Sequence, residues 1–82
     1  MSDVEARAEH AKRLLADDTL REAFDNVRVA AIDVWSRTAA ADVQQREIAW
    51  MTVKVLDRIR GELESIVNNG KIAAARVQNP LR

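Results

Sequence analysis

The sequence predicts an all-α protein with a three-helix arrangement, and three observations lead to this prediction. Apolar side chains recur every three to four residues, which places them on one side of a helix. The composition, with 48% hydrophobic residues that include many alanines and 32% charged residues, is typical of a helical protein. Patterns of helix-capping residues precede the periodic segments. We expect a short N-terminal helix, then an antiparallel helical hairpin with a long third helix, and an irregular C-terminal tail.

The first helix is expected over residues 3–16. Ser2 or Asp3 can cap its start, and the acidic side chains of Asp3 and Glu5 suit the positive end of the helix dipole. Its apolar stripe is narrow and consists of Val4, Ala8, Ala11 and Leu15. Because so small a stripe buries little area by itself, this helix needs a partner.

The second helix is expected over residues 19–37. Thr19 followed by Glu22 fits a capping box, and Asp18 is an alternative cap. The stripe that follows spans about four turns and consists of Leu20, Phe24, Val27, Ala31, Val34 and Trp35.

The third helix is expected from Val43 to about Asn69. The alanine-rich connection at 38–42 would allow one continuous helix, but Asp42 followed by Gln45 is a capping pattern and favours a turn. The stripe of the third helix has a spacing close to a heptad and consists of Ile48, Thr52, Val55, Leu56, Ile59, Leu63, Ile66 and Val67. Gly61 lies opposite this stripe.

The segment 68–70 has the composition of a helix end, with Gly70 able to adopt the left-handed conformation that closes a helix. We therefore expect one helical domain over residues 1–70 and a basic tail or docking arm over residues 71–82. Asn79 before Pro80 disfavours helix at the end of this tail. The simplest packing sets the second helix against the third, with the first helix packed across the pair. The third helix, roughly 40 Å long, overhangs a partner of about 28 Å and needs a further cover.

Composition and charge exclude several classes of protein. The absence of cysteine rules out a disulfide scaffold and a thiol-based nucleophile or metal site. No apolar run approaches the roughly 18 residues of a membrane span. His10 is the only histidine and has no carboxylate cluster beside it, so we expect no metal, no cofactor and no enzymatic activity. The formal net charge of zero is an average, because residues 1–69 have ten positive and thirteen negative side chains, whereas residues 70–82 have three positive ones alone.

Exposed apolar residues are the candidates for an interface. Trp50 lies on the polar side of the third helix, either packing over the loop onto Trp35 or the first helix, or anchoring a protein interface. The full candidate interface set is Val29, Ile32, Trp50, Met51, Ile72, Val77 and Leu81. The tail adds possible contacts to phosphate or to an acidic partner through Lys71, Arg76 and Arg82, although a tail that binds nothing is equally compatible with the sequence.

Several segments together resemble a group of short helical proteins that tailed phages and prophages encode beside head and packaging genes. The resemblance covers about residues 7–72 and lies in Arg7-Ala8, Ala11, Leu14-Leu15, Asp18, Leu20, Glu22-Ala23-Phe24-Asp25, Ile32, Trp35, Arg46-Glu47, Trp50, Val55, Ile59-Arg60, Leu63-Glu64-Ser65-Ile66 and Gly70-Lys71. It implies a helical accessory protein of the virion or of its assembly, with no catalytic residues to carry over.

We therefore expect a noncatalytic interaction protein that binds copies of itself, a larger head, portal or neck protein, or both. The host cytoplasm during assembly is the expected location, with the finished virion as a second one. The alternative is a small nucleic-acid-associated packaging or regulatory factor that uses the basic tail, against which the zero net charge counts.

Overall fold

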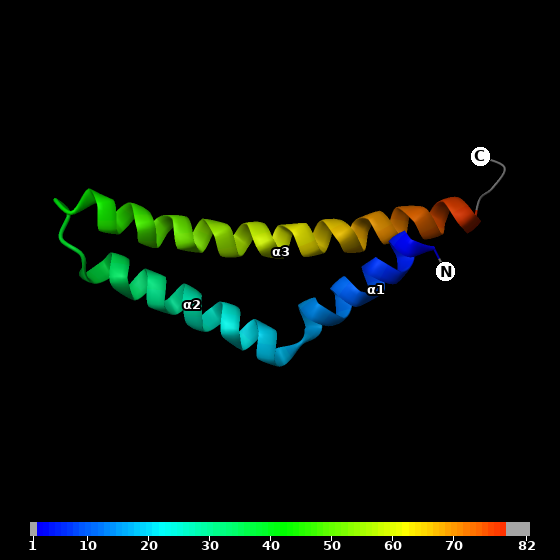
Figure 1. The fold of residues 1–82 in the computed structure, drawn as a ribbon, viewed down its shortest axis with the longest axis horizontal. Coiled ribbons are helices and arrows are strands. Elements are labelled where there is room, and N and C mark those ends of the chain that lie inside the picture. The colour runs from blue at the N-terminus through cyan, green and yellow to red at the C-terminus, as the bar shows by residue number, and fades with distance from the viewer. Residues whose placement is uncertain (1, 79–82) are drawn as a thin grey trace. The chain divides into compact units, whose positions relative to one another are not determined.

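The computed structural model describes residues 2–78 and has three helices with no strand among those residues (Figure 1). The helices are α1 (Asp3–Ala16), α2 (Asp18–Arg37) and α3 (Val43–Gln78). The predicted all-α class is therefore confirmed. The chain divides into two compact units, of which unit 1 is Met1–Asp17 with Arg60–Arg82, and unit 2 is Asp18–Ile59.

Two of the three predicted helix starts are capped as expected. The hydroxyl of Ser2 accepts a hydrogen bond from the Glu5 backbone N–H at 3.2 Å and donates one to the Glu5 carboxylate at the same distance. The carboxylate of Asp42 accepts a hydrogen bond from the Gln45 backbone N–H at 3.3 Å. These bonds satisfy N–H groups that have no partner inside the helix.

The start of α2 differs from the prediction by one residue. Asp18 and Thr19 both lie inside the first turn of α2, so the expected capping by either residue is wrong. The break between helices is the single residue Asp17, whose backbone is extended with φ −72° and ψ 117°. This extended backbone ends α1. The Asp17 N–H still has a partner, because it bonds to the Leu14 carbonyl at 3.2 Å.

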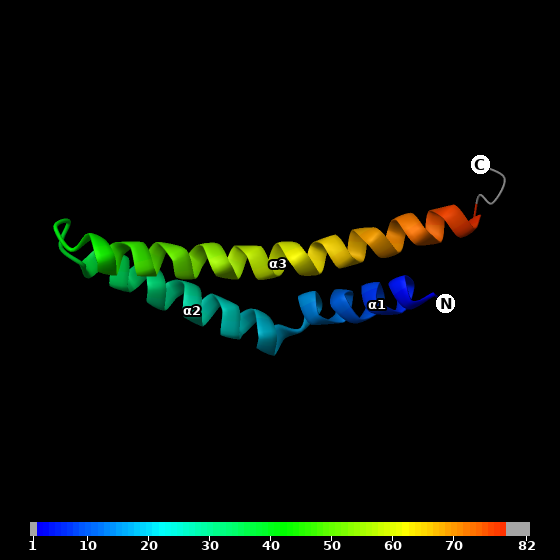
Figure 2. The same cartoon turned by 45° about the horizontal axis from the view of Figure 1, so that its top comes forward.

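Unit 2 is an antiparallel helical hairpin of α2 and the first part of α3, as predicted, joined by residues 38–42 (Figures 1 and 2). Ala31 of α2 and Ala49 of α3 are its buried apolar residues. An ion pair between Arg28 and Asp57 joins the same two helices.

Arg46 ties the loop end of this hairpin together. Its guanidinium donates hydrogen bonds to the backbone carbonyls of Trp35 and Thr38, at 3.4 and 3.2 Å. It also lies 4.2 Å from the centroid of the Trp35 ring, which is within the range of a cation–π interaction. One side chain of α3 therefore holds both the carbonyls and the aromatic ring at the end of α2.

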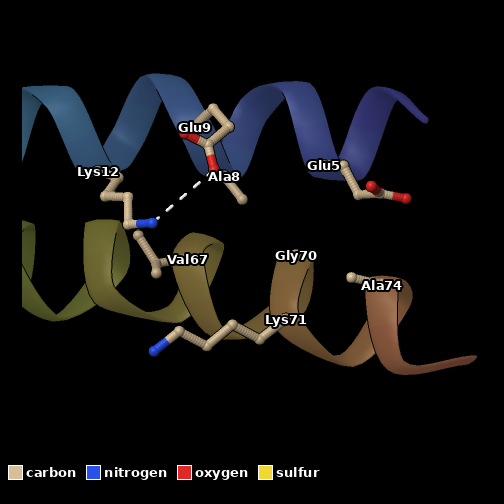
Figure 3. Close-up of a pocket in the computed structure, with 8 residues that line it drawn as sticks. All are labelled: Glu5, Ala8, Glu9, Lys12, Val67, Gly70, Lys71 and Ala74. Atoms are coloured by element: carbon tan, nitrogen blue, oxygen red, sulfur yellow. Dashed lines mark ion pairs between the residues drawn. The ribbon is translucent and has the colours of Figure 1, made fainter. Parts of the chain in front are cut away.

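Unit 1 pairs α1 with the second part of α3, and the two helices run in opposite directions (Figures 1 and 2). Ala8, Ala11 and Gly70 are buried at this contact. A Cβ atom built on Gly70 would lie 2.1 Å from the Cβ of Ala8, and Figure 3 shows the two residues opposite each other. The helices therefore approach so closely that only glycine fits at position 70 without a shift.

This close approach explains why the predicted end of the third helix is wrong. Gly70 has no positive φ, and α3 continues through it to Gln78. The next residues are mostly alanine, lysine and arginine, which favour helix. The predicted irregular tail is therefore helical over 71–78, and residues 79–82 lie outside the described part. Within unit 1 this extension of α3 contacts α1, so the overhang expected from the sequence has a partner.

The core of the described residues is made of small side chains. The buried apolar residues are alanines, and no large side chain is fully buried among residues 2–76. Thirteen large apolar residues are exposed instead. Since buried apolar area is the main stabilising term in folding, each unit has little internal stabilisation.

Replacing Gly70 with alanine should lower the free energy of unfolding by about 1–3 kcal/mol, because the new methyl group overlaps Ala8. Adding Ala8→Gly to this variant should recover part of the loss by removing the atom that clashes. Urea denaturation followed by circular dichroism measures both effects.

Gly61 provides the matched control in the same unit, since a Cβ there meets nothing within 4 Å. Gly61→Ala should raise the free energy of unfolding by about 0.5–1 kcal/mol, which is the helix propensity gained. Equal stabilisation by both glycine replacements would contradict the close contact between α1 and α3.

Arg46 and Lys54 allow a second matched comparison, because each cation lies over a tryptophan ring and only Arg46 bonds the carbonyls at the end of α2. Arg46→Ala should cost about 1–2 kcal/mol of unfolding free energy, and Lys54→Ala less than about 1 kcal/mol. If thermal and urea unfolding give the same loss for both variants, the two hydrogen bonds of Arg46 contribute nothing to stability.

Candidate interaction surface

An apolar groove with two tryptophans lies on one side of the contact between α2 and α3 in unit 2. This tryptophan groove has a volume of about 350 Å³ and is lined by Ala31, Ile32, Trp35, Ala49, Trp50 and Val53. Trp35 is 44% exposed and Trp50 is 56% exposed. Two large aromatic surfaces are thus available to a partner at one place.

A second groove of unit 2 has no charged side chain in its lining. This valine groove has a volume of about 470 Å³ and is lined by Val27, Ile48, Met51, Thr52, Val55 and Leu56. Trp50 and Met51 are consecutive and point about 100° apart around α3, which is why neighbouring residues line different grooves. Unit 2 therefore presents apolar surface in two directions.

Positive charge lies beside both tryptophans of the first groove. The Lys54 ammonium is 4.5 Å from the centroid of the Trp50 ring, and the Arg46 guanidinium is 4.2 Å from that of Trp35. Cations in these positions are attracted to the ring faces. A ligand for the tryptophan groove would therefore be apolar with acidic groups at its edge.

The structure brings some of the predicted interface residues together and separates others. Ile32 and Trp50 line the tryptophan groove, whereas Met51 lines the valine groove. Val29 is 65% exposed and lines neither groove. It is two residues from buried Ala31, which places it on the far side of α2, about 200° around the helix.

Sequence reasoning missed Trp35 and Val53 as parts of this surface. The sequence pattern places Trp35 in the apolar stripe of the second helix, but Trp35 belongs equally to a row with Ile32, three residues earlier. Val53 follows Trp50 by three residues on α3, with the same spacing as Ile32 and Trp35 on α2. Both pairs have the spacing of neighbours on a helix surface, and this is the signal that would have found them.

The predicted sites near the C-terminus are spread along α3 or lie outside the described residues. Ile72 is an exposed residue of α3, and the side chain of Val77 is not described. Leu81 and Arg82 lie outside the described residues. Arg76 is an exposed cation in the last turn of α3, where it suits the negative end of the helix dipole.

Lys71 is near α1 in unit 1, but its side chain runs along α3, away from the carboxylates of Glu5 and Glu9 (Figure 3). It lines a shallow pocket between α1 and α3 together with Glu5 and Glu9, and Lys12 pairs with Glu9 there at 3.8 Å (Figure 3). The lining contains two acidic and two basic residues and therefore has no net charge. The pocket is therefore a poor binding site for phosphate.

The chemistry available on this surface is that of apolar binding. Among residues 2–76 no polar side chain is buried, and no group of three His, Cys, Asp or Glu is placed to hold a metal ion. His10 is exposed on α1. None of the helices in the described part has the length and apolar content needed to cross a membrane.

Comparisons with protein-family models, with curated proteins and with solved structures found no match to this chain.

Proposed function

We propose that this chain is a noncatalytic interaction protein that binds other protein chains through the apolar grooves of unit 2. The observation that carries this proposal is the tryptophan groove, in which two half-exposed tryptophans lie side by side with Ile32 and Val53. Tryptophan is enriched among the residues that dominate the binding energy of protein interfaces.

The tryptophans offer a substantial part of a binding free energy. A buried tryptophan contributes about 150–250 Å², so the exposed halves of Trp35 and Trp50 amount to roughly one such side chain. At about 25 cal/mol per Å² this area provides about 4–6 kcal/mol. Because association costs about 4–15 kcal/mol, the surrounding apolar residues of unit 2 must also contribute to a stable complex.

The proposal extends to the biological setting through the resemblance to short phage-encoded proteins described above. In that setting the chain is an accessory protein of a tailed-phage particle that binds copies of itself, a head, portal or neck protein, or both. It acts in the host cytoplasm during assembly and is retained in the virion if its partner is a component of the finished particle.

A nucleic-acid role is the weaker alternative. Lys71 and Arg76 supply positive charge near the end of α3, but the pocket that Lys71 lines also contains Glu5 and Glu9 and has no net charge. Phosphate binding by a few cations would weaken steeply as salt rises. Tight DNA binding at 50 mM salt that is lost at 200 mM, and lost also in a Lys71→Ala, Arg76→Ala variant, would favour this alternative over the protein-binding proposal.

A photo-crosslinking amino acid at position 50 tests the proposed function directly. The chain is produced with benzoylphenylalanine in place of Trp50, in cells that also contain its binding partners. Ultraviolet light should then give covalent adducts with other protein chains, because this position lines the tryptophan groove. Gel electrophoresis and mass spectrometry would identify the adducts.

The same photo-crosslinker at Gly61 is the matched control, since that position has open space around it and lines neither groove. It should give few adducts. An absence of protein adducts from position 50, or equal yields from both positions, would contradict protein binding through the tryptophan groove.

A further inference from the structure

In unit 2, α3 carries a row of exposed apolar residues, and three of them, Ile48, Met51 and Val55, also line the valine groove. The α3 stripe consists of Ile48, Met51, Val55 and Ile59, which are spaced three and four residues apart and share one side of the helix. Each of them exposes between 43% and 61% of its surface. Such spacing is typical of a helix that packs along another helix.

Two opposite charges flank this stripe symmetrically. Glu47 lies beside its first residue and Arg58 beside its last, eleven residues apart. Eleven residues make about three turns, so both side chains lie on the same edge of α3. Both are exposed, and neither forms an ion pair within the described residues.

This arrangement is complementary to itself when two copies of the helix run in opposite directions. The same edge of both helices then lies on the same side of the contact, and the residue numbers along the two edges run in opposite directions. Glu47 of each copy therefore meets Arg58 of the other. The midpoint between Glu47 and Arg58 and the midpoint between Ile48 and Ile59 both fall next to Val53. A single twofold axis therefore matches the apolar residues and the charges together.

We propose that two copies of this chain associate through the α3 stripe, with their α3 helices antiparallel about a twofold axis near Val53. Met51 of one copy packs against the partner's Val55, and Glu47 pairs with the partner's Arg58. This inference rests on the proposed function, because it names a second copy of the chain as the partner at the α3 stripe. The tryptophan groove stays available to another protein.

The size and charge of the chain favour a second copy as the occupant. Unit 2 spans residues 18–59, which is close to the length of about 40 residues below which domains usually need disulfides, metals or oligomerisation to be stable. The sequence has no cysteine, and residues 2–78 contain no group that could hold a metal ion. The formal net charge of zero means that two copies do not repel each other through net charge. Lys54 lies near the proposed axis, where the same residue of the second copy would bring a like charge. Its ammonium group extends over the Trp50 ring of its own chain.

Sedimentation equilibrium of the full chain tests the proposal. The wild type should sediment as a dimer. Val55→Glu should weaken the dimer about a hundredfold or more, because it would bury an unpaired charge in the contact. Val29→Glu is the matched control, since it makes the same change at an exposed valine of unit 2 that lies outside the stripe, and it should leave the dimer intact.

The flanking charges test the antiparallel arrangement while leaving the apolar contact in place. Glu47→Arg and Arg58→Glu should each weaken the dimer about threefold to tenfold, since each change removes two exposed ion pairs of the symmetric dimer. Combining the two changes should restore wild-type affinity. Circular dichroism of each variant checks that the helices are retained, and these exposed positions keep the test valid if Val55→Glu fails to fold.

A wild-type chain that remains monomeric, or a dimer that Val55→Glu leaves unchanged, would overturn the proposal. A dimer whose affinity the combined charge exchange does not restore would overturn the antiparallel pairing. Failure here is distinct from failure of the proposed function: a monomeric chain that still gives adducts with other proteins from position 50 refutes the dimer alone.

Discussion

Contact between helices through very small residues is the constraint on which the rest of this structure depends. In unit 1, Gly70 and Ala8 meet so closely that one added methyl group would overlap. In unit 2, Ala31 and Ala49 are the buried apolar residues. Such contacts let helices approach each other, but they remove little apolar area from water, and buried apolar area supplies most of the stability of a fold.

Many of the larger apolar residues consequently remain exposed beside the helix contact. Trp35 and Trp50 line one groove of unit 2, and Met51 and Val55 line the other. Stable domains bury the apolar faces of their helices between packed layers. A hairpin that exposes apolar residues in two directions therefore lacks the further layers that would cover them. This connects the composition of the core to the proposal that the chain functions by binding other chains.

Much of the fold could be predicted from the sequence, because its causes are local. The capping pairs of Ser2 with Glu5 and Asp42 with Gln45 identify two of the helix starts. The end of α3 could not be predicted in this way. Gly70 fits a helix end in sequence, and only its contact with Ala8, sixty-two positions away, shows why glycine stands inside a helix. The sequence predicts Ile32 and Trp50 as interface residues, and both line the tryptophan groove, but the grooves themselves could not be predicted, because which apolar residues remain exposed depends on how closely the helices pack.

The central claim is that this chain lacks a self-sufficient core and gains its stability by association. Thermal unfolding of the wild type, followed by circular dichroism over a hundredfold range of protein concentration, tests that claim most directly. If folded chains are stabilised by binding one another, the midpoint should rise by roughly 5–15 °C across this range, because mass action favours the associated folded state at high concentration. A midpoint that is the same at all concentrations, in a chain that unfolds cooperatively, would contradict it.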